Sequence, residues 1–74
     1  MATTVYTAII EKDGEIYAAL CPELDVASQG ATVEEATANL KEAVELFLES
    51  ADPREINQRL HGEVFITRFD AAHG

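Results

Sequence analysis

The sequence of 74 residues has one cysteine, no tryptophan and only five basic residues against fourteen acidic ones. Because Cys21 has no second cysteine to pair with, an intramolecular disulfide is excluded. His61 and His73 stand apart from Cys21, so no cluster is typical of a structural zinc site. A chain this short buries only about 60–65% of its unfolded surface, and small folds commonly add a disulfide, a metal or a partner subunit. By elimination, we expect self-association or binding to another chain.

Long apolar runs are also missing from the sequence. No stretch approaches the ~18 apolar residues of a membrane-spanning helix. The first ten residues, MATTVYTAII, lack the basic start and the long apolar core of a signal peptide. A lone cysteine also suits a reducing compartment. Residues 1–74 are therefore expected to form a single cytoplasmic domain without a metal or cofactor.

Positive charge is scarce, and the formal net charge is −9. Residues 1–50 hold ten of the acidic residues and only Lys12 and Lys41 as bases. Such a surface repels phosphate backbones, which argues against direct binding of nucleic acid. It attracts a basic protein and speeds the encounter, although acidity can also serve solubility alone.

One long amphipathic helix is predicted from Val33 to Ser50. Thr32 and Glu35 have the spacing of a capping box, in which each side chain accepts a backbone N–H of the other residue. The apolar stripe consists of Val33, Ala36, Leu40, Ala43, Val44, Phe47 and Ala51. The opposite face holds Glu34, Ala38, Lys41, Glu42, Glu45 and Glu49. Leu46 lies off the stripe, either as a scattered exposed leucine or as an interface residue.

A β-hairpin precedes this helix. Strand-forming runs cover Val5–Glu11 and Ile16–Cys21, and Asp13-Gly14 between them predicts a two-residue turn. This turn pairs Ile10 with Tyr17. One face then carries Tyr6, Ala8, Ile10, Tyr17, Ala19 and Cys21, and the other carries Val5, Thr7, Ile9, Ile16, Ala18 and Leu20. Both faces are apolar and one helix covers only one, so we expect another polypeptide on the bare side.

Two further strands complete the predicted fold. A short strand is expected over Asp25–Gln29, and the alternation in Glu63–Asp70 predicts a last one. A short helical turn is expected within Arg54–Gly62. The predicted order is β-β-β-α-β, an α+β domain whose antiparallel sheet packs on one long helix.

Few residues indicate catalysis. Cys21 could be a nucleophile with His61 as its base, but no local signature accompanies them, and cysteine is more often a small buried hydrophobic residue. Glu23 and Asp25 could bind a divalent cation, but they lack the spacing of a calcium loop. A binding domain is therefore favoured over an enzyme, and the role of residues 51–62 stays open.

A longer pattern resembles a known family. The residues that carry it are Tyr6, Ile9-Ile10-Glu11-Lys12-Asp13-Gly14, Tyr17, Cys21-Pro22-Glu23-Leu24, Ala27-Ser28-Gln29-Gly30, Thr32-Val33-Glu34-Glu35-Ala36 and Leu40-Lys41-Glu42-Ala43. Over residues 5–50 the chain resembles the HicB family, which comprises small antitoxin and antitoxin-like domains of bacteria and archaea. The most specific part is P-E-L…S-Q-G-x-T-x-E-E-A. The resemblance implies a partial RNase H-like fold with the order β-β-β-α-β.

The resemblance also implies a function. Full-length HicB proteins block HicA toxins, which are small basic RNA-cleaving proteins, by covering their RNA surface and catalytic histidine. This chain departs from the family at Leu24-Asp25-Val26-Ala27, where many members have Leu-Pro-Gly-Cys. The 74-residue chain has only Asp70–Gly74 left at the end of the last predicted strand, so the DNA-binding module of full-length members, and operator binding with it, is not expected.

Three functions stay open. The first is a HicB-like module that neutralises a basic HicA-type toxin and forms a homo-oligomer, either a dimer or a tetramer. The second is a structural homo-oligomer without a toxin, and the third and least favoured is a metal-dependent ribonuclease. The candidate partner-binding residues are Glu23, Asp25, Glu34, Glu42, Glu45 and Glu49, and the candidate oligomer-interface residues are Leu46, Tyr6 and Tyr17.

Overall fold

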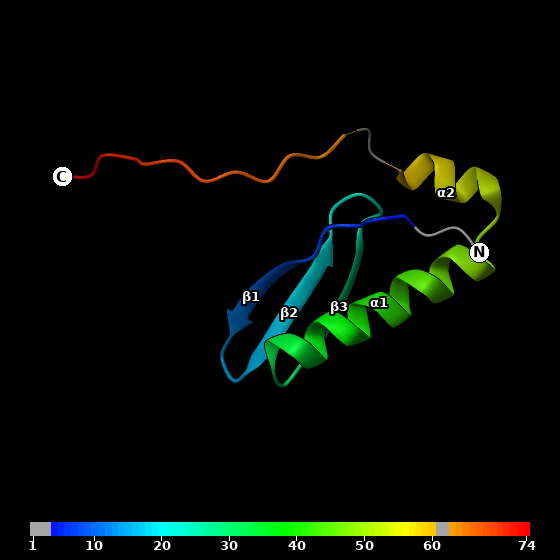
Figure 1. The fold of residues 1–74 in the computed structure, drawn as a ribbon, viewed down its shortest axis with the longest axis horizontal. Helices are drawn as coiled ribbons and strands as arrows, with labels where there is room; N and C mark the ends of the chain where they lie inside the picture. The colour runs from blue at the N-terminus through cyan, green and yellow to red at the C-terminus, as the bar shows by residue number, and fades with distance from the viewer. Residues whose placement is uncertain (1–3, 61–62) are drawn as a thin grey trace.

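The computed structural model describes residues 4–60 and 63–74. Figure 1 shows a small antiparallel sheet beside one long helix, then a short helix and an extended C-terminal segment. The elements in chain order are β1 (Ile9–Asp13), β2 (Ile16–Cys21), β3 (Val26–Gly30), α1 (Val33–Ser50) and α2 (Pro53–Arg59). The strands are ordered β1-β2-β3 with antiparallel pairing. The α+β class and the antiparallel sheet are therefore confirmed.

The hairpin turn lies one residue later than predicted. Gly14 and Glu15 form the loop, and Gly14 has a φ of 64°. A positive φ at only the first central residue is the pattern of a type II′ turn, in which glycine is favoured. Ile10 therefore pairs with Ala19 instead of Tyr17. The register moves by two residues, so every side chain keeps its predicted face.

The first strand begins at Ile9, later than the predicted start at Val5. Continuing the observed register would place Thr7 opposite Pro22, which has no N–H to donate. The Thr7 N–H is instead bound by the Glu23 carboxylate. The third strand also begins one residue late, because Asp25 has a φ of 55° and belongs to the preceding turn.

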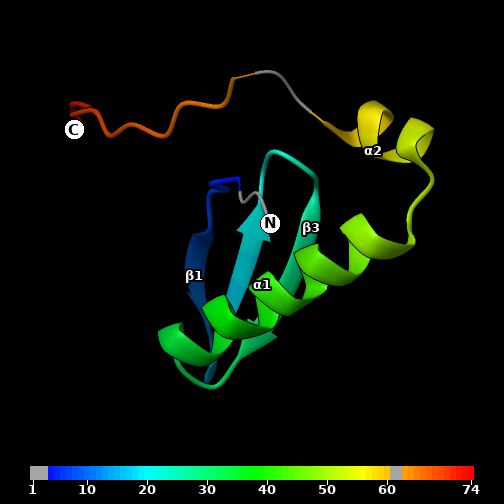
Figure 2. The same cartoon turned by 45° about the vertical axis from the view of Figure 1, so that its right-hand side comes forward.

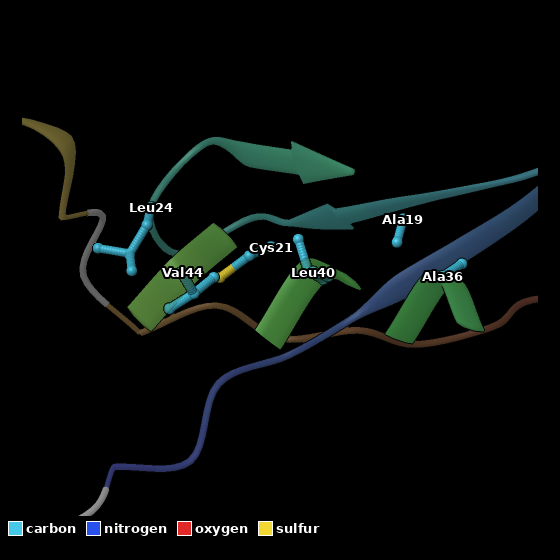
Figure 3. Packing of buried hydrophobic residues seen from close by; sticks show 6 residues of the cluster. All are labelled: Ala19, Cys21, Leu24, Ala36, Leu40 and Val44. Atoms are coloured by element: carbon cyan, nitrogen blue, oxygen red, sulfur yellow. The ribbon is translucent and has the colours of Figure 1, made fainter. Parts of the chain in front are cut away.

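The core lies between the sheet and α1. Its buried side chains are Ala19, Cys21, Leu24, Ala36, Leu40 and Val44. Figure 3 shows Leu24 and Val44 at one end of this cluster and Ala19 and Ala36 at the other. Tyr6, Ile10 and Tyr17 pack against the cluster, so the face that meets α1 is the one that carries Ala19 and Cys21. The sequence left open which of the two faces it would be.

The start of α1 is held by side chains and by a close backbone approach. The Thr32 hydroxyl accepts the Glu35 N–H at 3.0 Å, while the Glu35 carboxylate accepts the Ala31 N–H at 3.0 Å instead of the predicted Thr32 N–H. A Cβ on Gly30 would lie 2.5 Å from the backbone nitrogen of Ala36. The last residue of β3 must therefore lack a side chain, because β3 leads directly under the first turn of α1.

The short helix α2 confirms the predicted helical turn after α1. Asp52 caps it by accepting the Arg54 N–H at 2.8 Å, and Pro53 stands at its first position. The Arg59 guanidinium lies 4.9 Å from the centre of the Phe47 ring. A cation over an aromatic face is attractive, so this contact fastens α2 to the end of α1.

The predicted last strand is wrong for the single chain. The described residues 63–74 contain no helix or strand, and Figure 1 shows the orange and red trace running past the sheet instead of joining it. Phe65 is 81% exposed and Phe69 is 86% exposed. Alternating apolar residues favour an extended chain, but a strand also needs a neighbour to accept and donate its hydrogen bonds. His61 and Gly62 lie outside the described residues.

Candidate functional site

Cys21 is placed as a core residue. Its side chain is fully buried, and its Sγ lies 3.5 Å from Oε1 of Glu23, to which it donates. Burial raises the pKa of the Cys21 thiol, and the neighbouring Glu23 carboxylate raises it further against the effect of the Leu24 backbone. A thiol in this environment stays protonated and shielded, which is unfavourable for a nucleophile.

Glu23 connects the N-terminal segment to the turn between β2 and β3. Its two carboxylate oxygens each lie 3.1 Å from the Thr7 nitrogen, and Oε2 accepts the Thr7 hydroxyl at 2.6 Å. Burial opposes ionisation of Glu23, but the hydrogen bonds from Thr7 outweigh it and lower the pKa of this carboxyl. The geometry therefore gives Glu23 a structural task, which competes with its predicted partner-binding role.

Asp25 lies beside this connection in the same turn. The residue is exposed, and its carbonyl oxygen accepts a long hydrogen bond of 3.5 Å from the Arg59 guanidinium. The turn that carries Glu23 and Asp25 is thus held from one side by Thr7 and from the other by α2. Partner binding through Asp25 stays a prediction.

The outer face of α1 carries the remaining predicted carboxylates together. Glu34, Glu42, Glu45 and Glu49 are all exposed. Within residues 4–60 and 63–74, the ion pairs are Arg54–Asp52 and Arg59–Glu55, both around α2. Residues three or four apart on a helix lie about 5–6 Å apart at their Cβ atoms, so Glu42, Glu45 and Glu49 form a row of negative charge. Lys41, four residues before Glu45, is the cation nearest to this row along α1 and forms no ion pair with it.

The sheet face opposite α1 is apolar and uncovered by the described elements. Figure 2 shows α1 lying across one side of the three strands only. On the other side Ile16 is 38% exposed and Leu20 is 39% exposed. A shallow hollow there is lined by the apolar residues Ile9, Ala18, Ala19, Leu20 and Ala27 and by the polar residues Glu11 and Ser28. The expected apolar bare face is therefore confirmed.

The predicted oligomer-interface residues are not brought together. Tyr6 and Tyr17 are half-buried against the core on the helix side of the sheet, and the Lys12 ammonium lies 6.0 Å from the centre of the Tyr17 ring. Leu46 is 54% exposed on α1. The two tyrosines thus contribute to the fold itself, whereas Leu46 is placed where another chain could reach it.

An apolar groove runs between the N-terminal segment and α1, and sequence reasoning missed it. It has a volume of about 310 Å³, the space of roughly ten water molecules. Its lining residues are Thr4, Tyr6, Thr7, Ala8, Cys21, Thr37, Leu40, Lys41, Val44 and Glu45. The groove exists because α1 packs mainly on β3 and β2 and contacts β1 little, and no pattern in the sequence predicts that lateral offset.

No protein-family model, no curated protein and no solved structure matches the chain. The HicB resemblance therefore stays a hypothesis based on the residues quoted for it. In the part of the chain that the structure describes, no helix is long and apolar enough to cross a membrane. Among the same residues, no group of three or more His, Cys, Asp or Glu side chains is arranged to hold a metal ion.

Proposed function

We propose that the chain is a protein-binding module whose partner is a basic protein, and that this partner is a HicA-type RNA-cleaving toxin. The observation that supports a basic partner is the row of exposed carboxylates on α1, Glu42, Glu45 and Glu49, which form no ion pair among the described residues and outnumber the one neighbouring cation, Lys41. The toxin as partner rests on the HicB resemblance. Lysines and arginines of the partner that bind RNA phosphates would bind the carboxylates of this row instead.

We also propose the finer fold assignment, a partial RNase H-like domain. The order of β1, β2, β3 and α1 supports it, since this is the order that the resemblance implies up to the helix. The fourth strand of such a domain has no counterpart among residues 4–60 and 63–74.

The test uses a purified basic protein of about 60–80 residues encoded next to this chain, which is the size expected of such a toxin. The affinity is measured by isothermal titration calorimetry at 50 mM and 300 mM salt. Exposed ion pairs contribute about 0.2–1 kcal/mol each, so Glu42→Gln, Glu45→Gln and Glu49→Gln together should weaken binding about tenfold at low salt.

A matched control removes three exposed carboxylates from the hairpin through Glu11→Gln, Asp13→Asn and Glu15→Gln. Both triple variants lose the same net charge, so only the α1 variant should show the full loss if the row is the contact surface. Equal losses would mean that net charge alone attracts the partner. No binding at 50 mM salt would refute a basic partner.

A second candidate function is a structural homo-oligomer without a toxin. The apolar face with Ile9, Ile16 and Leu20 favours it, because large exposed apolar patches commonly mark interfaces. Light scattering that gives a monomer at high micromolar concentration would remove this candidate.

A further inference from the structure

We propose that residues 63–70 of one chain form a fourth strand along the free edge of β1 in a second copy, and that the exchange is reciprocal. This inference does not depend on a toxin partner. It concerns how two copies complete each other's fold, and it rests on three observations: the unpaired segment, the edge and groove beside β1, and the surface area of the chain.

The segment has the properties of a strand without a neighbour. Its residues alternate so that Phe65 and Phe69 fall on one side and Val64 and Ile66 on the other. In addition to the two exposed phenylalanines, Ile66 is 57% exposed. A strand that is apolar on both sides fits a position in a sheet that is covered on both sides, and water covers most of this segment in the single chain.

The β1 edge offers such a position. Within the described sheet, β1 pairs only with β2, so its outer edge has backbone groups free to pair with another strand. A strand added there would have the groove beside Tyr6 and Ala8 on one side and would extend the bare face of Ile9 and Ile16 on the other. Both sides of the new position are mainly apolar, and so are both sides of the segment, apart from Arg68 on the side of Val64 and Ile66.

The opposite edge of the sheet is less open. The Gln29 carbonyl oxygen, in β3, already accepts the Asn39 side-chain amide at 2.8 Å, and α1 packs more closely on β3 than on the other strands. The Arg59 guanidinium also reaches the Asp25 carbonyl just before β3. These contacts favour β1 as the edge that receives the segment.

The surface area of the chain is large enough for an interface with a second copy. The chain exposes 6110 Å², whereas a compact monomer of 8.1 kDa is expected to expose about 4,500 Å². Its radius of gyration is 14.3 Å, against about 11 Å for a compact domain of this length. The excess of roughly 1,600 Å² is about twice what one partner buries in a standard interface, so a reciprocal exchange has enough area for a stable dimer.

The direction of the segment also favours exchange over closure onto the same chain. The Arg59 contacts with Phe47 and Asp25 hold α2 against the domain. From there the segment runs past the end of the sheet without turning along β1, and Figure 2 shows the C-terminus at the far end of the molecule from α2. Such an extended arm can reach a second copy without disturbing its own domain.

The test combines light scattering with NMR of the whole chain. We expect a mass of twice 8.1 kDa at about 200 μM. In a sample that mixes labelled and unlabelled chains, isotope-filtered spectra should show contacts between the rings of Phe65 and Phe69 in one copy and the Ala8 and Ile10 methyl groups in the other.

The paired variant is Phe65→Asp with Phe69→Asp, and the control is Leu46→Asp, which also charges an exposed apolar residue. Because Phe65 and Phe69 are 81% and 86% exposed in the single chain, the paired variant should keep its helical circular dichroism. Its dimer dissociation constant should rise on the order of 100-fold, since buried aromatic anchors dominate interfaces, whereas Leu46→Asp should change it less than about threefold.

Four results would overturn the exchange. In light scattering, the contradicting result is a monomer at 200 μM. In the NMR spectra, it is either contacts between the phenylalanine rings and β1 only within one chain, or a dimer whose intermolecular contacts involve Ile16 and Leu20 but not residues 63–70. Among the variants, it is a dimer that dissociates on Leu46→Asp but not on the paired substitution. If the paired variant fails to fold, the NMR measurement on the unmodified chain still decides.

Discussion

Replacing Glu23 by glutamine should weaken the connection between the N-terminal segment and the turn after β2. The carboxylate accepts the Thr7 hydroxyl at 2.6 Å and shares the Thr7 N–H between both oxygens. Hydrogen bonds to a charged group contribute about 1.5–3 kcal/mol each, and an amide oxygen keeps part of this interaction. We therefore expect Glu23→Gln to lower the free energy of unfolding by about 1–2 kcal/mol at pH 7.

The pH dependence of this loss follows from the direction of the pKa shift. Burial opposes the charge of Glu23, but the Thr7 hydrogen bonds outweigh it and place the folded-state pKa below its usual value. The contribution is therefore complete above the unfolded pKa of about 4.3 and is lost as the pH falls through the folded pKa. The difference in free energy of unfolding between the unmodified chain and the Glu23→Gln variant should be constant from pH 7 to about pH 5 and should shrink below about pH 4.

The assay is urea denaturation followed by far-ultraviolet circular dichroism at one fixed protein concentration, because any dimer makes stability depend on concentration. Glu15→Gln is the control, since Glu15 is exposed in the hairpin turn. Thr7→Val combined with Glu23→Gln should cost less than the sum of the single changes. Two results would refute the connection between Glu23 and Thr7. The first is a loss of unfolding free energy for Glu23→Gln that lies within about 0.3 kcal/mol of the loss for Glu15→Gln. The second is a loss for the Thr7→Val and Glu23→Gln double variant that equals the sum of the two single losses.

Two further substitutions test the packing of α1. Gly30→Ala should lower the free energy of unfolding by about 2 kcal/mol or more, because the new Cβ would lie 2.5 Å from the Ala36 nitrogen. Calorimetry measures this as a drop in melting temperature. An unchanged melting temperature would refute the close approach of β3 to α1. Leu40→Ala should cost about 2–5 kcal/mol in urea denaturation, because Leu40 is only 4% exposed, while Leu46→Ala should change stability by less than about 1 kcal/mol.

The helix and the hairpin could be predicted because their signals are local. Thr32 at the cap and the periodic stripe through Ala36, Leu40 and Val44 define α1 within its own segment, and the predicted bounds match the observed ones. The Asp13-Gly14 pair correctly predicted a hairpin. The positive φ of Gly14 places the turn at Gly14-Glu15 instead of Asp13-Gly14. A register error of two residues was the consequence, and it left the faces correct.

The candidate site was predicted only in part. Periodicity alone placed Glu42, Glu45 and Glu49 on the exposed side of α1, and the structure agrees. Glu23 seemed equally available, but its hydrogen bonds to Thr7 join residues sixteen positions apart. No local pattern reports such a contact, because it depends on how two separate segments meet.

The sequence by itself determined the bounds of β2 and of the long helix, the presence of a hairpin before that helix, and which side chains share a sheet face, because turn chemistry and side-chain periodicity act over a few residues. Only the tertiary structure decided which face meets α1, that a groove stays open beside β1, and that residues 63–70 have no neighbour to pair with in the single chain. Those outcomes depend on the relative placement of distant elements, and a strand exists only where another strand can satisfy its backbone hydrogen bonds.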